Sequence, residues 1–218
     1  MTREELIKKV ALKMDEISSS DDVIVPVNQS DNNPLYTQIN NLLNESVNDV
    51  LMKAPIYRIQ SQVAVVSKGD ILTELRFDGA IKIAAIKVPN DFIRIASIYD
   101  KEFQRPIVDL SIEGDEVDKR QHNKFLVAKG AKPVAVIGRT ADGGRVIICY
   151  SYDTSKTPDP VVQYVKRYEN DSDTHADTDL DDYMVDIVSW VCAGKVFAAQ
   201  GDINKGKICD DNASALMI

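Results

Sequence analysis

The chain has 218 residues, of which 44% are hydrophobic and 28% are charged. These proportions are typical of a globular protein with its own hydrophobic core, and they exclude wholesale disorder. The formal net charge of −8 and the pI near 4.8 argue against a protein that binds nucleic-acid phosphates over a broad surface.

Two amphipathic helices are expected in residues 1–55. Thr2 and Glu5 form a capping-box pattern, which satisfies backbone donors at a helix start, and apolar residues then recur at helical spacing. Pro34 suits the first position of a second helix with Asn33 as its N-cap, and Pro55 ends that helix. The sequence between the two helices begins with an extended VIVPV segment and continues as a polar stretch.

The hydrophobic period changes to two between residues 57 and 168. Eight short runs rich in Val, Ile, Tyr and Phe predict strands separated by turns: YRIQSQVAVV, DILTELRF, AIKIAAIKVP, DFIRIASIYD, KFLVAK, PVAVIG, RVIICYSY and VVQYVKRY. The strongest hairpin signal is Asp142 followed by Gly143 and Gly144. Phe125 falls in the alternating run KFLVAK, which predicts a core position for its side chain. Residues 56–168 are therefore expected to form an antiparallel sheet or a small barrel.

The C-terminal part is expected to be an acidic linker at 169–179 followed by helices in 180–218. Segments 1–55 and 180–218 each carry apolar surface that they cannot bury alone, so we expect them to pack as one helical bundle. Helices segregated from an antiparallel sheet define the α+β class, which is the predicted fold class. The apolar stretch at 183–199 is interrupted by Asp186 and Lys195, so no membrane span is expected and the protein is predicted to be soluble.

The three cysteines do not form a recognisable disulfide or zinc pattern. Cys149, Cys192 and Cys209 are far apart in sequence, and the two histidines, His122 and His175, are remote from them. This arrangement favours a reducing compartment and predicts no metal or other cofactor.

The acidic run before the third long helix is the main candidate metal site. Its aspartates fall at positions 1, 3, 7, 9 and 12 of a possible calcium loop: Asp171, Asp173, Asp177, Asp179 and Asp182. Alanine stands where that loop needs glycine, and aspartate replaces its final glutamate. These mismatches favour a solvated linker whose last aspartates complement the positive end of the next helix. A calcium-binding or hydrolytic protein that uses this segment is the alternative from another functional class.

No catalytic constellation is recognised elsewhere, so the chain is not expected to be an enzyme. Asp115, Glu116 and Asp118 could pair as acid and base near His122, but no nucleophile motif accompanies them, and a solvated loop is favoured. The lysines around Phe125 are interpreted as rim charges, because a single-strand binding surface needs several interleaved aromatic residues.

An assembly interface is the remaining candidate. Tyr183, Trp190 and Phe197 are spaced by seven on one face of the predicted helix, where core packing is the simpler interpretation and an interface stripe the alternative. The apolar chain end, with Leu216, Met217 and Ile218, could also be buried by a neighbouring subunit.

Several segments resemble the head-to-tail connector proteins (adaptor or ring proteins) of tailed bacteriophages. The similarity is greatest to tail tubular A-like proteins and extends to ring proteins of crAss-like phages. The segments are NNLLNESVNDVLMKAPIY, KVPNDFIRIASIYDKEFQRPI, RVIICYSYD and DYMVDIVSWVCAGKVFAAQGD. The insert VIVPVNQSDNNP and the acidic linker depart from the family pattern.

The resemblance implies a non-enzymatic subunit of a closed, dodecameric ring that joins the portal to the tail. Such a ring extends the DNA channel, and it contacts the portal and further ring or tail proteins. DNA passes through it without sequence-specific binding. The expected location is the virion, after synthesis in the host cytoplasm. Another ring or tail-completion subunit is the alternative within this class.

Overall fold

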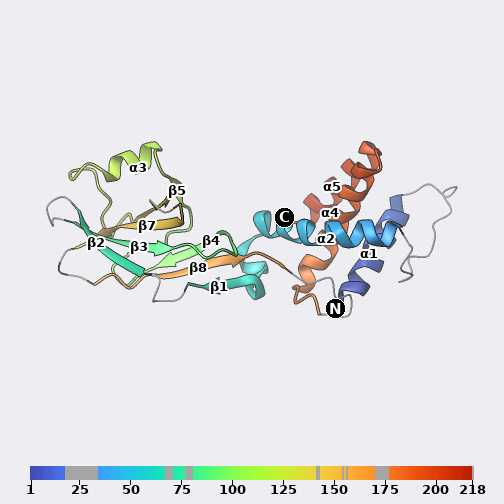
Figure 1. The fold of residues 1–218 in the computed structure, drawn as a ribbon, viewed down its shortest axis with the longest axis horizontal. Coiled ribbons are helices and arrows are strands. Elements are labelled where there is room, and N and C mark those ends of the chain that lie inside the picture. The colour runs from blue at the N-terminus through green and yellow to red at the C-terminus, as the bar shows by residue number, and fades with distance from the viewer. Residues whose placement is uncertain are drawn as a thin grey trace. The chain divides into compact units, whose positions relative to one another are not determined.

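The computed structural model describes residues 1–17, 34–66, 71–76, 81–140, 143–153, 155, 157–169 and 177–217. Helices and mostly antiparallel strands are segregated (Figure 1), so the predicted α+β class is confirmed. The chain divides into a helical unit, residues 1–62 with 167–218, and a β unit, residues 63–166. Both chain ends belong to the helical unit. In the sequence, the β unit is inserted between the two segments that form the helical unit. The expected boundaries were after residues 55 and 168, and the two units divide after residues 62 and 166.

The described residues of the helical unit form four long helices and two short 3₁₀ turns. They are α1 (Arg3–Ile17), α2 (Pro34–Lys53), η1 (Ile56–Arg58), η2 (Gln60–Gln62), α4 (Asp182–Ala199) and α5 (Ile203–Leu216). The capping box at α1 is confirmed, because the Thr2 N–H donates to Glu5 Oε2 at 2.9 Å and the Glu5 N–H donates to Thr2 Oγ1 at 3.2 Å. The expected N-cap Asn33 and the VIVPV segment lie outside the described residues.

The centre of the helical unit is α4. Eleven of its 18 residues are buried, and it packs against α1, α2 and α5, as expected for a helix that is apolar on most faces. The apolar stripes of the first two helices supply the rest of this core, with Leu6, Ile7 and Val10 from α1 and Leu43, Val47 and Val50 from α2. No helix in the described part of the chain is long and apolar enough to cross a membrane.

A buried arginine joins α1 to α2. Arg3 is almost fully buried, and its Nε and Nη1 donate to the side-chain oxygens of Asn40 and Asn44 at 2.7 and 2.8 Å. Its Nη2 donates to the backbone oxygen of Asn40 at 2.8 Å. These directed bonds fix the register of the two helices, since a buried guanidinium is costly unless its donors are satisfied.

Eight strands in two sheets and one short helix make up the part of the β unit that the structure describes. The elements are β1 (Val63–Val65), β2 (Ile71–Arg76), β3 (Ile81–Lys87), β4 (Phe92–Tyr99), β5 (Ser111–Ile112), α3 (Glu116–Gln121), β6 (Val134–Arg139), β7 (Arg145–Tyr152) and β8 (Val161–Lys166). One sheet has the order β1-β8-β4 and the other β2-β3-β7-β6-β5, with all pairs antiparallel except β5 and β6. The described strands form two sheets and not a closed barrel, because β4 pairs with β8 and not with β3, the strand before it.

The two sheets share one apolar core. It includes Ile86 and Ile147 from the larger sheet and Ile98, Val162 and Tyr164 from the smaller one. The hairpin predicted at ADGG joins β6 to β7 and is confirmed: Arg139 lies opposite Arg145, and the Thr140 N–H donates to the Gly144 carbonyl at 2.8 Å. Asp142 itself lies outside the described residues.

The interpretation of KFLVAK as a strand was wrong. Residues 124–129 follow α3 as a loop, and Phe125 is 82% exposed instead of lying in the core. The alternating pattern misled because only Val127 of this run turns inward far enough to be buried. The six-residue helix α3 takes the place of part of the expected loop, with Asp115 as its N-cap.

Candidate functional site

The outer surface of α5 is the first candidate for assembly contacts. Only three residues of this 14-residue helix are buried within the chain, namely Gly206, Cys209 and Ala213. Ile203 is 76% exposed and Ile208 and Leu216 are also exposed. The helix therefore presents large apolar side chains that its own unit does not cover, a feature typical of surfaces that meet another protein.

Two glycines bring α5 close to α4. A β-carbon at position 194 would lie 3.2 Å from the β-carbon of Cys209, and one at position 206 would lie 3.2 Å from the backbone oxygen of Gly194. Such spacing is tighter than ordinary van der Waals contact. Small residues at this crossing therefore explain why a helix with so few buried residues is still held against the unit.

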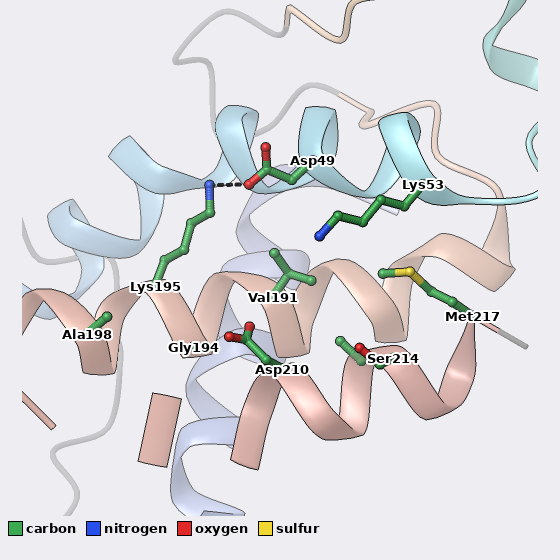
Figure 2. Close-up of a pocket in the computed structure, with 10 residues that line it drawn as sticks. Asp49, Lys53, Val191, Gly194, Lys195, Ala198, Asp210, Ser214 and Met217 are labelled. Carbon is green, nitrogen blue, oxygen red and sulfur yellow. Dashed lines mark ion pairs between the residues drawn. The ribbon is translucent and has the colours of Figure 1, made fainter. Parts of the chain in front are cut away.

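Beside this crossing lies a groove of about 370 Å³ between α2, α4 and α5. Figure 2 shows Lys53, Asp49 and Lys195 on its α2 and α4 sides, with Asp210 opposite them on α5. Lys53 and Asp210 make no ion pair with another described residue. The groove thus offers one cationic and one anionic group at its walls, with Val191 and Met217 as apolar lining.

Lys195 is the fixed charge of the groove. Its Nζ lies 2.5 Å from Glu45 Oε1 and 2.6 Å from Asp49 Oδ2, which ties α4 to α2. Partial burial lowers the pKa of this ammonium, but the bonds to Asp49 and Glu45 outweigh that effect, so its pKa lies above the ordinary value. The ammonium is therefore committed to the two α2 carboxylates and is not a free nucleophile or base.

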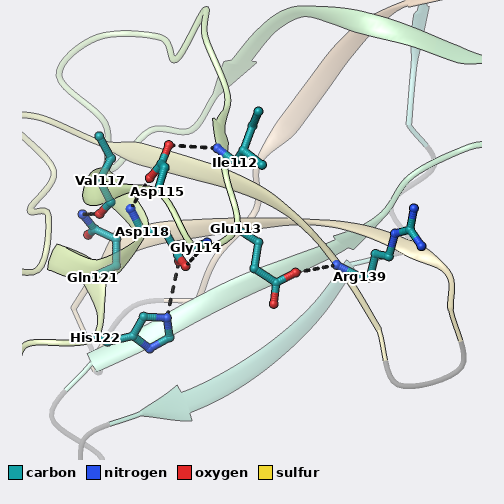
Figure 3. Close-up of polar contacts among 9 residues, drawn as sticks. All are labelled: Ile112, Glu113, Gly114, Asp115, Val117, Asp118, Gln121, His122 and Arg139. Atoms are coloured by element: carbon teal, nitrogen blue, oxygen red, sulfur yellow. Dashed lines mark hydrogen bonds and ion pairs between the residues drawn. The ribbon is translucent and has the colours of Figure 1, made fainter.

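The acidic residues around α3 accept hydrogen bonds from backbone N–H groups. Asp115 Oδ1 accepts from the Asp118 N–H at 2.7 Å, and its Oδ2 accepts from the Ile112 N–H at 3.1 Å (Figure 3). Asp118 Oδ2 accepts from the Gly114 N–H at 2.9 Å, and its Oδ1 lies 3.4 Å from His122 Nε2. The bond from the Asp118 N–H lowers the pKa of Asp115. These carboxylates cap a helix and close a turn, which accounts for them without an acid–base role.

The five aspartates of the possible calcium loop are only partly described, since Asp171 and Asp173 lie outside the described residues. Asp177 Oδ1 accepts from the Met1 amino group at 2.8 Å, and Asp179 adopts a left-handed backbone with φ of 46°. Asp182 is the first residue of α4. Among the described residues, no group of three His, Cys, Asp or Glu side chains is arranged to hold a metal ion.

The aromatic residues considered as an alternative interface stripe pack mostly within the chain. Trp190 and Phe197 are buried in the helical unit, as core packing predicts, so they leave little surface for a partner. Tyr183 donates through its hydroxyl to the Leu216 backbone oxygen at 3.2 Å, and the Arg58 guanidinium lies 4.5 Å from its ring centroid. Leu216 is exposed and Met217 lines the groove, whereas Ile218 lies outside the described residues.

The cysteines are free and buried. Burial raises the pKa of the Cys192 and Cys209 thiols to about 11, and it raises the pKa of the Cys149 thiol further. A neutral thiol is a poor nucleophile and a poor metal ligand, so these residues behave as small apolar side chains.

Sequence reasoning missed the groove and the exposed loop after α3. The groove depends on which faces of α2, α4 and α5 remain uncovered, which spacing along a single helix does not reveal. The chain also matches no family model, and no curated protein that was compared matches it.

Proposed function

We propose that this chain is a structural, non-enzymatic subunit of a phage head-to-tail connector, in which copies form a closed ring between the portal and the tail. The observation that carries the proposal is the surface of α5, where Ile203, Ile208 and Leu216 are exposed while only three small residues face the chain's own core. A heterologous contact of this kind, repeated around a rotation axis, closes into a ring. The resemblance described above adds the dodecameric stoichiometry and the location in the virion.

The order of the units supports the same proposal. The two chain ends build one helical unit and the β unit is inserted between them. This is the order of helices, sheet and helices in the segments that resemble connector proteins. An inserted unit lets one part of the subunit make ring contacts while the other meets further ring or tail proteins.

The charge is divided unequally between the units. Residues 63–166 contain 16 basic and 14 acidic residues, a net charge of +2, so the helical unit carries −10. An acidic helical unit suits a conduit, because phosphates that pass such a surface are repelled and not held. The near-neutral β unit is suited to contacts with other proteins.

The proposed ring contact is tested by replacing one exposed apolar residue at a time. Ile208→Glu on α5 should lower the apparent mass of the assembled species in sedimentation velocity, because a buried, unpaired carboxylate opposes association. Leu12→Glu on α1 is the matched control, since Leu12 is also an exposed apolar residue on a long helix. Equal self-association of the wild type and the Ile208 variant, or equal loss in both variants, would contradict the role of α5.

A further inference from the structure

A second candidate binding site lies in the β unit, beside the loop that follows α3. It is a pocket of about 690 Å³, bounded on one side by residues 124, 125 and 127–130 and on the other by the end of β7 and Glu102. Its volume falls within the usual range for pockets that bind ligands. None of the contacts assigned above to ring formation uses this pocket.

Ser151, which lines the pocket, has an unusual backbone. Cys149 lies opposite Ala84 and Tyr152 opposite Lys82, so β7 carries one extra residue and forms a β-bulge. Ser151 adopts φ of 111° at this bulge, a conformation that favours glycine. Strained backbone of this kind is concentrated at functional sites, which makes Ser151 a candidate for such a site.

The hydroxyl of Ser151 is also unsatisfied. The residue is 9% exposed, and its Oγ has no hydrogen-bond partner among the described residues. A buried polar atom without a partner is rare in proteins, because it loses its bonds to water and gains none in return. An incoming polar group in the pocket would supply the missing partner.

The opposite wall is a rigid loop with exposed apolar side chains. The four backbone N–H groups of residues 125–128 donate to Gln121 or Asn123, each at 2.9 Å. This fixed loop leaves Phe125 82% exposed and Leu126 59% exposed. An aromatic side chain held out by an ordered backbone is typical of protein contact sites, since little conformational entropy is lost when a partner covers it.

The charges at the rim indicate the kind of partner. Lys124 and Lys129 are exposed and make no ion pair with another described residue, and Lys124 Nζ lies 5.2 Å from the Phe125 ring centroid. Glu102 and Asp153 also line the pocket. A nucleic-acid strand would bring its phosphates against these carboxylates. A peptide offers an acidic side chain as acceptor for the lysines and places only a neutral backbone beside the carboxylates.

We propose that this pocket binds an extended segment of a partner protein that carries an apolar or aromatic side chain next to an acidic one. The apolar side chain packs on Phe125, the acidic one reaches Lys124 and Lys129, and a backbone polar group bonds the Ser151 hydroxyl. The inference deepens the proposed function by giving the β unit a site for another ring or tail protein. It rests on that function only for the identity of the partner.

The experiment uses the full chain and a displayed library of random octapeptides. Selection against the immobilised wild type should enrich peptides with an aromatic or aliphatic residue beside aspartate or glutamate. An enriched peptide is then synthesised with a fluorophore, and its affinity is measured by anisotropy. Labelled single-stranded oligothymidine is measured in parallel, because it tests the nucleic-acid alternative directly.

Four variants decide the outcome. Phe125→Ala should weaken peptide binding by about thirtyfold, as for an aromatic hot spot. Ser151→Gly and Ser151→Ala should each weaken it by about three- to tenfold, since each removes one hydrogen bond. Val108→Ala, which removes an exposed apolar side chain that does not line the pocket, should leave affinity unchanged.

Three results would overturn the proposal: no enrichment, binding that ignores Phe125 and Ser151, or Phe125-dependent binding of oligothymidine without peptide binding. The ring proposal is judged separately by self-association, which the pocket variants should not alter. Failure of one proposal is therefore distinguishable from failure of the other.

Discussion

Replacing Ser151 by glycine should stabilise the β unit, although glycine inside a strand usually destabilises it. The serine combines two costs: a left-handed backbone at φ of 111° and a buried hydroxyl without a partner among the described residues. The backbone cost is about 1–2 kcal/mol for an L-residue, and the unsatisfied hydroxyl costs about 1–3 kcal/mol. Glycine offsets this stabilisation by about 0.5–1 kcal/mol, because it loses more conformational entropy on folding than serine does.

The lower ends of these ranges give an expected net gain of about 1–2 kcal/mol. In a unit of about 100 residues this corresponds to a rise in melting temperature of about 5–10 °C. Ser151→Ala separates the two contributions, because it removes the hydroxyl but keeps the strained backbone. It should therefore give a smaller gain than the glycine variant.

The assay follows the two units separately. Trp190 is the single tryptophan and lies in the helical unit, so its fluorescence reports the unfolding of that unit. The eight tyrosines are divided equally between the two units, so circular dichroism of tyrosine in the near ultraviolet reports both. The part of its transition that does not coincide with the tryptophan transition follows the β unit, which contains Tyr150, Tyr152 and Tyr164. The gain should appear in the tyrosine transition and not in the tryptophan transition. A lower melting temperature for Ser151→Gly would refute the reasoning that backbone strain and the unsatisfied hydroxyl together outweigh the entropy cost of glycine.

Three further outcomes are expected in the helical unit. Arg3→Met should destabilise it by about 2–4 kcal/mol, because the asparagine groups of α2 lose their buried donor. Urea unfolding followed by tryptophan fluorescence measures this change, and an unchanged midpoint would contradict the role of this arginine. Gly206→Leu should cost about 2–3 kcal/mol by forcing α5 away from α4, whereas Ala215→Leu, at an exposed position of the same helix, should cost little. Burial holds the pKa of Cys192 and Cys209 at about 11, so both thiols should resist a disulfide reagent at pH 8 until the protein unfolds. Because the unfolded thiols ionise near pH 8.5 and the folded ones only near 11, stability should fall as pH rises through this window, and rapid labelling of the native protein would contradict the burial.

Patterns confined to one element were predictable from the sequence. The capping box of Thr2 and Glu5, the helix that begins at Pro34 and the hairpin at Gly143 each depend on residues a few positions apart. Their physical causes are local, namely backbone donors at a helix start, a missing proline N–H and a left-handed turn.

Features that depend on distant partners were not predictable. Phe125 was expected in the core because alternation alone cannot show whether a strand partner exists, and residues 124–129 have none. The strain at Ser151 arises from the register between β3 and β7, which the sequence of either strand does not specify. The α3 helix was missed because it is short, although Asp115 and Asp118 carried a recognisable capping signal.

The candidate assembly surface also combines a feature that was predictable from local sequence with one that depends on distant partners. Tyr183, Trp190 and Phe197 share a helix face, as their spacing predicts, but whether that face meets the chain's own core or another subunit depends on α1, α2 and α5. In this structure Trp190 and Phe197 are covered within the chain, and the uncovered apolar residues lie on α5 instead. Only the tertiary arrangement distinguishes the two cases.

The proposal that this chain is a connector-ring subunit is tested by mass photometry of the purified protein, alone and mixed with a phage portal protein. We expect a ring-sized mass for the chain alone, or a complex whose mass is the portal plus a ring of this chain. A monomer that stays monomeric as its concentration rises and that ignores the portal would contradict the claim.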